Sequence, residues 1–298
     1  METDFILHKA ESLHVNMLAL SIYDNGQIST WHKENTHWRN NVYSVTKSVT
    51  ALVVGLLQER RLIDPFRDTV EDCLGEEIPP SLRTAWGKVK LYHLLTHTTG
   101  FDHDCLDIDN NDASQWDPTD YLGRVLQCPL VYVPGSEMVY CDANYYLLSR
   151  CIAERTGKTL QDWAQREIFK PLCIVGAAWS VCPDGYAIGA TGLFLTVEDM
   201  LKIGIMLLQH GTYQVQQIVS PEWIGEVTKK RVSTDRIGRD SYGLGFWVRA
   251  DTAAFMANGM LGQLIYVSPK TSRVVAWQSC DSGSGIGPLT DFIVASDT

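Results

Sequence analysis

Three patterns of apolar and polar residues follow one another along the chain. Residues 16–23 and 27–31 carry short apolar runs on either side of Asp24-Asn25-Gly26. Asn-Gly is the residue pair that a tight hairpin turn favours, because both central positions need a positive φ. The N-terminal pattern therefore predicts a hairpin and the beginning of an antiparallel sheet.

The second pattern predicts a helix from Ser44 to about Arg60. Apolar residues recur there at helical spacing, at Val45, Val49, Leu52, Val53, Leu56 and Leu57. Arg60 and Arg61 lie where cations stabilise the C-terminus of a helix. Ser44 is thus expected at or near the start of a buried helix.

The third pattern is a helical and loop-rich stretch after Asp64-Pro65, which gives way to strands near the C-terminus. Helix starts are indicated by capping residues and by prolines at Asp117-Pro118, Asp142, Thr196 and Ser220-Pro221. Gly157 is expected to end the helix that Asp142 begins. Strand patterns return at residues 242–248, 253–258, 262–267 and 273–278.

These elements predict an α+β fold, in which an antiparallel sheet built from both chain ends is flanked by helices. Residues 1–62 and 186–298 are expected to form this α/β sheet subdomain. Residues 63–185 are expected to form an inserted, mainly helical subdomain, with the active site between the two.

Composition narrows the range of partners. The 25 Lys and Arg against 35 Asp and Glu give a net charge of 25 − 35 = −10. Because binding to nucleic acid needs clustered cations, we expect no nucleic-acid partner. The longest apolar run, residues 51–57, is far shorter than the roughly 20 residues that span a bilayer, so no membrane association is expected. The acidic start Met1-Glu-Thr-Asp is unlike a secretory signal, which makes a cytoplasmic location the simplest expectation.

The chain holds eight cysteines, none of them in a C-x-x-C pair. A disulfide framework is typical of much shorter secreted chains. We therefore expect free and mostly buried thiols.

Ser44-Val-Thr-Lys47 is the first candidate for chemistry. One helical turn separates the two residues, so the amine of Lys47 can reach the hydroxyl of Ser44. A partly desolvated lysine near a helix N-terminus has a lowered pKa and can act as a base. The alternative is an N-cap serine followed by a surface lysine, but the apolar residues on both sides carry the motif toward the interior.

Tyr140-Cys141-Asp142 is the second candidate. A phenol beside a lysine can share its proton and pass it to a leaving group, which gives general acid-base chemistry without a histidine. Tyr140 could instead be an ordinary core tyrosine, and Asp142 could serve only as a helix N-cap.

The third candidate is Asn258-Gly259-Met260, at the expected end of a strand that enters a hairpin. Glycine lets a backbone approach closely, and the N–H of Met260 could help to stabilise an oxyanion together with the N–H of Ser44. The alternative is that the glycines of this stretch serve only a turn.

Taken in chain order, six motifs resemble those of the serine beta-lactamase-related family, in its branch of class C enzymes and penicillin-binding-like esterases and amide hydrolases. The resemblance covers about residues 14–295 and rests on Ser44-Val-Thr-Lys47-Ser48, Leu94-Leu-Thr-His97-Thr-Thr-Gly100, Pro134-Gly135 followed by Tyr140-Cys-Asp142, Phe169-Lys-Pro-Leu172, Ala190–Asp199, and Asn258-Gly259 through Pro269.

This resemblance implies a penicillin-binding-type fold in which Ser44 is acylated, Lys47 activates it and Tyr140 shuttles the proton before water hydrolyses the acyl-enzyme. Two departures from the family pattern matter. The second motif usually ends in Asn, whereas Asp142 would favour the lysine cation or attract a substrate amine. Ala257 stands where true beta-lactamases have a Lys or His that positions the substrate carboxylate.

Three other motifs suggest different chemistry, but each fits the residues less well than the serine hydrolase does. His93, His97 and His103 follow the spacing of a metzincin zinc site, but Leu94 replaces the glutamate that would activate water. Cys280-Asp-Ser282 is better explained as a loop than as a trypsin-like serine. Cys141 lacks the partnered histidine of a cysteine protease in the sequence. We expect no metal and no cofactor.

The leading hypothesis is a serine hydrolase that cleaves a small ester or amide, and only poorly a beta-lactam. Its catalytic residues are Ser44, Lys47 and Tyr140, and its substrate-binding or oxyanion residues are Asp142, Asn258, Gly259 and Met260. The alternative hypothesis is a catalytically impaired ligand-binding or sensor protein on the same fold. The substrate and the oligomeric state are open at this point.

Overall fold

The N-terminal hairpin is present in the computed structural model, which describes residues 3–110, 119–236, 239–249 and 252–297. Strand β1 (Met17–Asp24) pairs with β2 (Gln27–His32). Asn25 and Gly26 between them have φ values of 48° and 90°, the two positive values that the tight turn requires.

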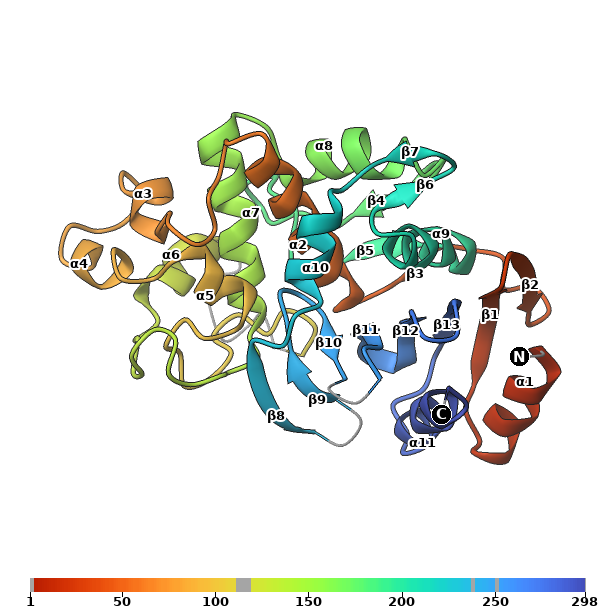
Figure 1. Ribbon diagram of the computed structural model, residues 1–298. Coiled ribbons are helices and arrows are strands. Elements are labelled where there is room, and N and C mark those ends of the chain that lie inside the picture. The colour runs from red at the N-terminus through yellow and green to blue at the C-terminus, as the bar shows by residue number, and fades with distance from the viewer. Residues whose placement is uncertain (1–2, 111–118, 237–238, 250–251, 298) are drawn as a thin grey trace. The chain divides into compact units, whose positions relative to one another are not determined.

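The main sheet has eight antiparallel strands in the order β2-β1-β13-β12-β11-β10-β9-β8 (Figure 1). Because β1 pairs directly with β13, the two ends of the chain close one sheet, which confirms the prediction. The remaining strands are β8 (Val232–Arg236), β9 (Arg239–Tyr242), β10 (Trp247–Val248), β11 (Phe255–Gly259), β12 (Gln263–Ser268) and β13 (Arg273–Ser279).

The single strand predicted for residues 242–248 is wrong, because it is two strands with a turn between them. The N–H of Gly243 donates to the carbonyl of Phe246 at 2.8 Å, and Gly245 has a φ of 82°. A Cβ on Gly243 would lie 2.1 Å from the carbonyl oxygen of Val227, so the chain there passes too close to its neighbour for any other residue.

Helix α9 (Val197–Leu208) packs on β12 and β13. The side chain of Thr196 accepts a hydrogen bond from the N–H of Asp199, as expected of the predicted cap. Gly204 allows the helix to lie close to the sheet, since a Cβ there would be 2.3 Å from a methyl group of Val274. The main sheet and α9 belong to one group of elements. The other helices and short strands of this group are α1 (Thr3–Ser12), β3 (Asn40–Asn41), β5 (Leu193–Leu195), β6 (Thr212–Tyr213), β7 (Gln216–Gln217), α10 (Pro221–Val227), η3 (Met260–Gly262) and α11 (Ile286–Ala295).

A second group of elements is mainly helical and is built around α7 (Asp142–Thr156), which is buried from Asp142 to Ile152. Gly157 ends α7 with a φ of 66°, as predicted. The residues Asp117-Pro118 lie outside the described part, and the helix after them is capped by Asp120. The other elements in this part of the chain are α2 (Val45–Glu59), α3 (Val70–Leu74), α4 (Arg83–Trp86), α5 (Leu91–Leu95), α6 (Tyr121–Gln127), α8 (Leu160–Ala164) and η2 (Gln165–Phe169). Strand β4 (Ala178–Trp179) belongs to a three-stranded sheet in the order β3-β5-β4.

The chain divides into two units, and the site residues are divided with it. The first unit comprises residues 1–45, 169–178 and 193–298, and the second comprises residues 46–168 and 179–192. Nearly all of α2 is thus grouped with the helical unit. The predicted boundaries at residues 62 and 185, and the active site between the subdomains, stay predictions.

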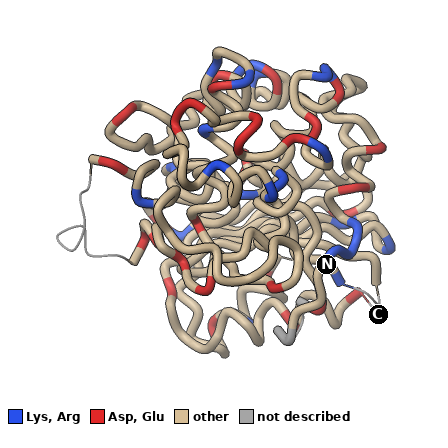
Figure 2. Tube along the Cα trace, turned by 90° about the vertical axis from the view of Figure 1, so that its left-hand side faces the viewer, with Lys and Arg blue, Asp and Glu red and all other residues tan. Residues whose placement is uncertain are grey.

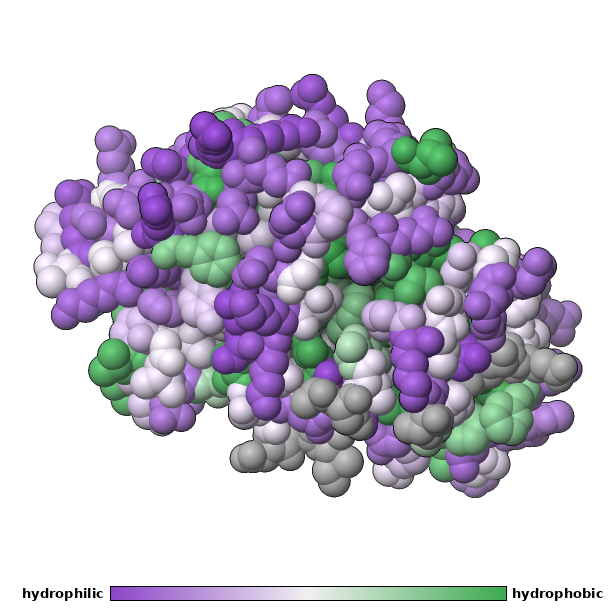
Figure 3. All heavy atoms as spheres, viewed as in Figure 1, coloured by the Kyte–Doolittle hydropathy of each residue, from purple (hydrophilic) through white to green (hydrophobic). Residues whose placement is uncertain are grey.

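The described surface is mainly hydrophilic on the face shown in Figure 3, and acidic and basic residues are interspersed along the trace in Figure 2. Among the described residues, no helix has the length and apolar character needed to cross a bilayer.

The eight cysteines are free thiols, and five are buried, as predicted: Cys105, Cys128, Cys141, Cys151 and Cys182.

Candidate active site

Ser44 lies in a tight turn that leads directly into α2. Tyr43 before it has a φ of 46°, a left-handed conformation that costs a non-glycine residue about 1–3 kcal/mol. The N–H of Tyr43 donates to Oδ1 of Asn41 at 2.9 Å, and the N–H of Val45 donates to the carbonyl of Val42 at 3.1 Å. These bonds hold Ser44, which is partly exposed, at the N-terminus of the helix.

The end of β11 lies against the residues that precede Ser44. A Cβ on Gly259 would be 2.2 Å from the carbonyl oxygen of Val42, so only glycine allows this approach. Oδ1 of Asn258 is buried and has no hydrogen-bond partner among the described residues, and Met260 is 39% exposed. The first unit therefore brings Asn258, Gly259 and Met260 beside the Ser44 turn.

We expect Gly259→Ala to lower both stability and activity. The added methyl group would clash with backbone, which cannot move as a side chain can, and overpacking of this kind costs about 1–3 kcal/mol. Gly225→Ala is the matched control, because Gly225 lies in α10 and its added methyl group would have no atom within 4 Å. Thermal unfolding and esterase assays of both variants check this, and equal melting temperatures for the two would contradict it.

Lys47 is completely buried on the first turn of α2, in the second unit. Its Nζ donates to Oδ1 of Asp142 at 2.7 Å and to the carbonyl of Ala190 at 3.1 Å. The centroid of the Tyr140 ring lies 4.8 Å from the same Nζ. The amine of Lys47 thus contacts both of the other residues that the sequence singled out in this unit, Tyr140 and Asp142.

The charge state of Lys47 is set by its neighbours. Burial alone would lower the pKa of Lys47, but the charge of Asp142, the nearby Tyr140 and the hydrogen bond to Asp142 outweigh burial and raise the pKa far above its usual value. Burial raises the pKa of Asp142, and the positive charge of Lys47 opposes that rise. Lys47 is therefore held as an ammonium that is ion-paired with Asp142, and the lowered pKa expected from the sequence for this lysine is not found.

Tyr140 is held by His97, a residue that the sequence analysis named in one of the six family motifs and for a zinc-like spacing. The two rings are stacked, with centroids 4.2 Å apart. His97 is buried, and its Nδ1 accepts hydrogen bonds from the backbone N–H of Cys141 at 3.1 Å and from the side chain of Asn144 at 3.2 Å. Because Nδ1 is an acceptor, the ring proton is on Nε2, and the imidazole is fixed as a platform for Tyr140.

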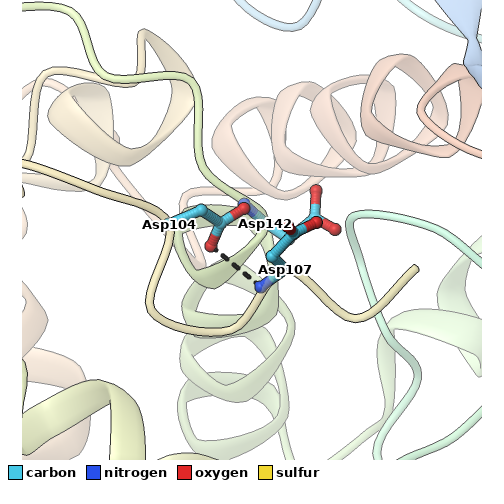
Figure 4. A group of neighbouring side chains, drawn as sticks. All are labelled: Asp104, Asp107 and Asp142. Atoms are coloured by element: carbon cyan, nitrogen blue, oxygen red, sulfur yellow. Dashed lines mark hydrogen bonds between the residues drawn. The ribbon is translucent and has the colours of Figure 1, made fainter. Parts of the chain in front are cut away.

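Asp142 belongs to a group of three carboxylates with Asp104 and Asp107 (Figure 4). Each offers an oxygen within 4.8 Å of the others. Asp104 accepts hydrogen bonds from the N–H of Asp142 at 2.6 Å and from the thiol of Cys141 at 3.1 Å. With Lys47 included, this group has a formal charge of 1 − 3 = −2 when all four side chains are ionised.

The predicted N-cap role of Asp142 is wrong. Asp142 is the first residue of α7, and Cys141 occupies the N-cap position. The carboxylate of Asp142 is turned toward Lys47. Asp104 therefore accepts the hydrogen bond from the backbone N–H of Asp142, which has no partner within the helix. A negative charge at a helix N-terminus is favourable, which also explains why Asp104 lies there.

The histidines of the zinc-like motif do not converge on a metal site in the described chain. Nδ1 of His93 accepts from the backbone of Lys90, His97 is committed to Cys141 and Asn144, and His103 pairs with Asp102 at 2.6 Å. The one group of three or more close ligand atoms in the described residues is that of Asp104, Asp107 and Asp142.

Comparison with known proteins shows the family to which the chain belongs. The family model for beta-lactamase matches residues 6–285, and the chain belongs to the beta-lactamase family. This is the family of serine hydrolases that the six sequence motifs indicated, and the family prediction is confirmed.

Individual relatives are distant. A "Putative D-alanyl-D-alanine carboxypeptidase" of Salmonella paratyphi A is 25% identical over 165 residues, which are 53% of this chain and 37% of that protein. The chain therefore spans little more than a third of the length of the curated relatives it matches.

Two solved structures share the fold. One is described as "Putative 6-aminohexanoate-dimer hydrolase from Bacillus anthracis", with a TM-score of 0.83, 18% identity and coverage of 99% of this chain and 81% of the other. The other is a D-stereospecific amidohydrolase from Streptomyces, with a TM-score of 0.78, 17% identity and coverage of 98% of both chains. At these identities they show the predicted fold class and no more.

Proposed function

We propose that the protein is a serine hydrolase that forms an acyl-enzyme on Ser44 and cleaves a small ester or amide. The observation that carries this proposal is the buried Lys47, one helical turn after Ser44 and in contact with both Tyr140 and Asp142. Burying an ammonium is costly unless it is paired and used, and such groups are concentrated at functional sites. Membership of the beta-lactamase family also supports a serine hydrolase.

In the proposed reaction, Ser44 Oγ attacks the substrate carbonyl while its proton passes to the Lys47 and Tyr140 pair. The pair then delivers that proton to the leaving alcohol or amine, which departs as the ester of Ser44 forms. In the second half, water attacks this ester and gives a proton to the same pair. The bond between the acyl carbon and Ser44 Oγ then breaks, and the proton passes to Oγ as the acid product leaves. The N–H groups of Ser44 and Met260 are the proposed donors to the oxyanion, and Asn258 is the proposed contact for a polar substrate group.

The substrate class follows from charge. Three carboxylates near one lysine favour a neutral or cationic acyl or leaving group over one that carries a carboxylate. Ala257 offers no charge to a substrate carboxylate, so a penicillin is a poor candidate. We propose amino-substituted esters and amides as the first substrates to try, with no cofactor.

A ligand-binding or sensor protein that acylates without turning over is the second candidate. It is favoured by the ion pair of Lys47 and Asp142, because a lysine held as an ammonium is a weak base. An acyl adduct on Ser44 that forms but does not clear would support this candidate and exclude an efficient hydrolase.

The proposal is tested by labelling with a fluorophosphonate, which reacts with activated serines. Wild-type protein should be labelled at one site and Ser44→Ala should not. Ser48→Ala is the matched control, since Ser48 lies four residues after Ser44, in α2. Failure of the wild type to react, or equal labelling of Ser44→Ala, would overturn the proposal.

Asp142→Asn is expected to shift the pH dependence of acylation. Removing the carboxylate takes away the charge that favours the ammonium, so the pKa of Lys47 falls and more of it is neutral at a given pH. The rising limb of the plot of kcat/KM against pH should therefore move to lower pH. On that limb, kcat/KM at a fixed pH should rise about tenfold for each unit by which the pKa of Lys47 falls. Asp107→Asn removes a nearby charge without touching Lys47 and should shift the limb less. Identical profiles for wild type and Asp142→Asn would leave Asp142 without a role in proton transfer.

A further inference from the structure

Strand β2 is the last strand at one end of the main sheet, and no described strand pairs with its outer edge (Figure 1). Residues 27–30 are exposed, and Ile28 is 60% exposed. Natural sheets usually protect such an edge with charged side chains, a proline, a bulge or a covering segment, because its free N–H and C=O groups can pair with another chain. Gln27–His32 contains no proline, lysine or acidic residue, and its register with β1 is uninterrupted.

The opposite end of the same sheet is protected. There β8 is the last strand, and its pairing with β9 shifts register between Ser233 and Arg236. The sequence of β8 also includes Asp235 beside Arg236. Irregular pairing and charges are common defences of an edge strand. The lack of protection is therefore specific to β2.

One hydrogen bond shows which backbone groups of β2 point outward. The N–H of Lys33 donates to the carbonyl of Leu18 at 2.8 Å, so the backbone of Lys33 faces β1. Backbone groups alternate between the two sides of an antiparallel strand, so every second residue before Lys33 also faces β1. Apart from β1, no described segment forms a backbone hydrogen bond with β2. The residues whose N–H and C=O groups point away from the sheet are Ile28, Thr30 and His32.

The same edge of a second copy of the chain satisfies these groups in one register. Outward-pointing residues must lie opposite each other, so in an antiparallel pair around a two-fold axis Thr30 lies opposite its own copy and Ile28 lies opposite His32. About six backbone hydrogen bonds form in this register, two at each of the three pairs. A shift by one residue opposes outward to inward groups, and a shift by two leaves fewer pairs.

Charges at the two ends of the edge favour this antiparallel orientation. Asp4 and Asp24 line a pocket of about 420 Å³ at the start of β2. Asp24 is paired with Arg273 at 3.0 Å, so the charge offered to a partner comes from the exposed Asp4. Lys33 follows the end of β2 and lines a second pocket of about 370 Å³, which Glu11 of α1 also lines. Antiparallel pairing brings Lys33 of one copy to the start of β2 in the other, beside the acidic pocket, whereas parallel pairing would bring like charges together.

Pairing would also cover the apolar side chains of β2. Side chains alternate between the faces of a strand. Ser29 lies on the face of α1, where its hydroxyl is 2.8 Å from that of Thr3, and Trp31 lies on the same face. In the register above, Trp31 of one copy lies opposite Ser29 of the other, and the exposed Ile28 lies opposite the ring of His32. The edge is thus complementary to itself on both faces.

We propose that the protein forms a two-fold symmetric dimer by antiparallel pairing of β2 with the β2 of a second copy, which joins the two main sheets into one. The interface belongs to the first unit and uses none of the proposed catalytic residues. The dimer is therefore independent of the proposed function, and its test needs no substrate.

Sedimentation velocity of the full chain tests the interface. The wild type should sediment as a dimer at micromolar concentration. Thr30→Lys places like charges directly opposite each other on the axis and should raise the dissociation constant about fivefold or more. Thr30→Glu should do the same, and an equal mixture of the two variants should restore the dimer.

Val215→Lys is the matched control for this test, since Val215 is fully exposed between β6 and β7 and should not affect the dimer. Melting temperatures confirm that each variant is folded. A wild type that stays monomeric at high micromolar concentration would overturn the proposal and leave the edge to a different chain. A dimer that folded Thr30→Lys does not weaken would place the interface elsewhere.

Disulfide cross-linking tests the register. Opposite residues of a hydrogen-bonded pair have Cα atoms about 5.5 Å apart, which a disulfide can span. With the exposed Cys173 and Cys280 changed to serine, Thr30→Cys should give a covalent dimer under mild oxidation. Ser29→Cys is the matched control, because Ser29 lies opposite Trp31 of the copy and should cross-link far more slowly. Cross-linking through Ser29→Cys alone would overturn the register, and cross-linking through neither would overturn the pairing.

Discussion

Lys47→Met should remove acylation of Ser44 and destabilise the protein as well. Methionine keeps most of the volume of the lysine but offers no proton donor or base, so acylation is expected to fall by about 10³-fold or more. The same change leaves the buried carboxylate of Asp142 without its partner, and breaking a buried ion pair in this way costs about 3–5 kcal/mol. Labelling kinetics and denaturant unfolding measure the two effects separately.

The double variant Lys47→Met with Asp142→Asn separates the structural from the catalytic role. Neutralising Asp142 removes the buried unpaired charge, so much of the lost free energy of unfolding should return. Acylation should stay as slow as in the single variant, because the missing amine of Lys47, and not the lower stability, limits its rate. Recovery of labelling together with stability would mean that Lys47 only holds the fold.

The elements of the fold were predictable where the pattern is local. The hairpin at Asn25-Gly26, the helix after Ser44 and the capping box at Thr196 each depend on residues within a few positions of one another. Pairing of β1 with β13 was predictable only because strand patterns occur at both ends of the chain and each strand needs an adjacent strand for its backbone hydrogen bonds. Gly243 and Gly245 signalled the break in the predicted strand at 242–248, but their meaning depends on a close contact with Val227.

The candidate site was predictable in its motif residues and not in what surrounds them. Ser44 and Lys47 are one turn apart in sequence, and Tyr140 and Asp142 are neighbouring positions of one motif. Asp104 is 38 residues from Asp142, and its hydrogen bond to the start of α7 follows only from the tertiary fold. The density of aspartates between residues 102 and 109 was a signal that could have drawn attention to it.

The error at Asp142 has a clear physical origin. An aspartate ahead of a helical pattern is the usual sign of an N-cap, because its side chain can accept from the first free N–H groups. Here the buried ammonium of Lys47 is a stronger partner for the carboxylate than a backbone N–H, and a second carboxylate replaces it as the acceptor. Local capping rules fail where a tertiary charge competes for the same side chain.

Tyr140→Phe should slow turnover by about 10²–10⁴-fold and leave the fold intact. The phenyl ring keeps the stacking on His97 and the contact with Lys47, so only the hydroxyl that carries the proton is lost. Single-turnover kinetics with a chromogenic ester measure the two halves of the reaction. If Tyr140 serves both halves, acylation and release of the acyl group should slow together.

Tyr145→Phe is the matched control for this variant. Its hydroxyl donates to the carbonyl of Leu95 at 2.9 Å, and its ring also lies beside His97, with centroids 5.1 Å apart. Losing that hydrogen bond leaves a buried carbonyl unsatisfied, which costs about 1–3 kcal/mol of stability and does not involve proton transfer. Tyr145→Phe should therefore lower the melting temperature with nearly normal kcat. Tyr140→Phe should lower kcat and leave the melting temperature nearly unchanged. A large loss of kcat in both variants would place the effect in the packing around His97 and remove Tyr140 from the proton path.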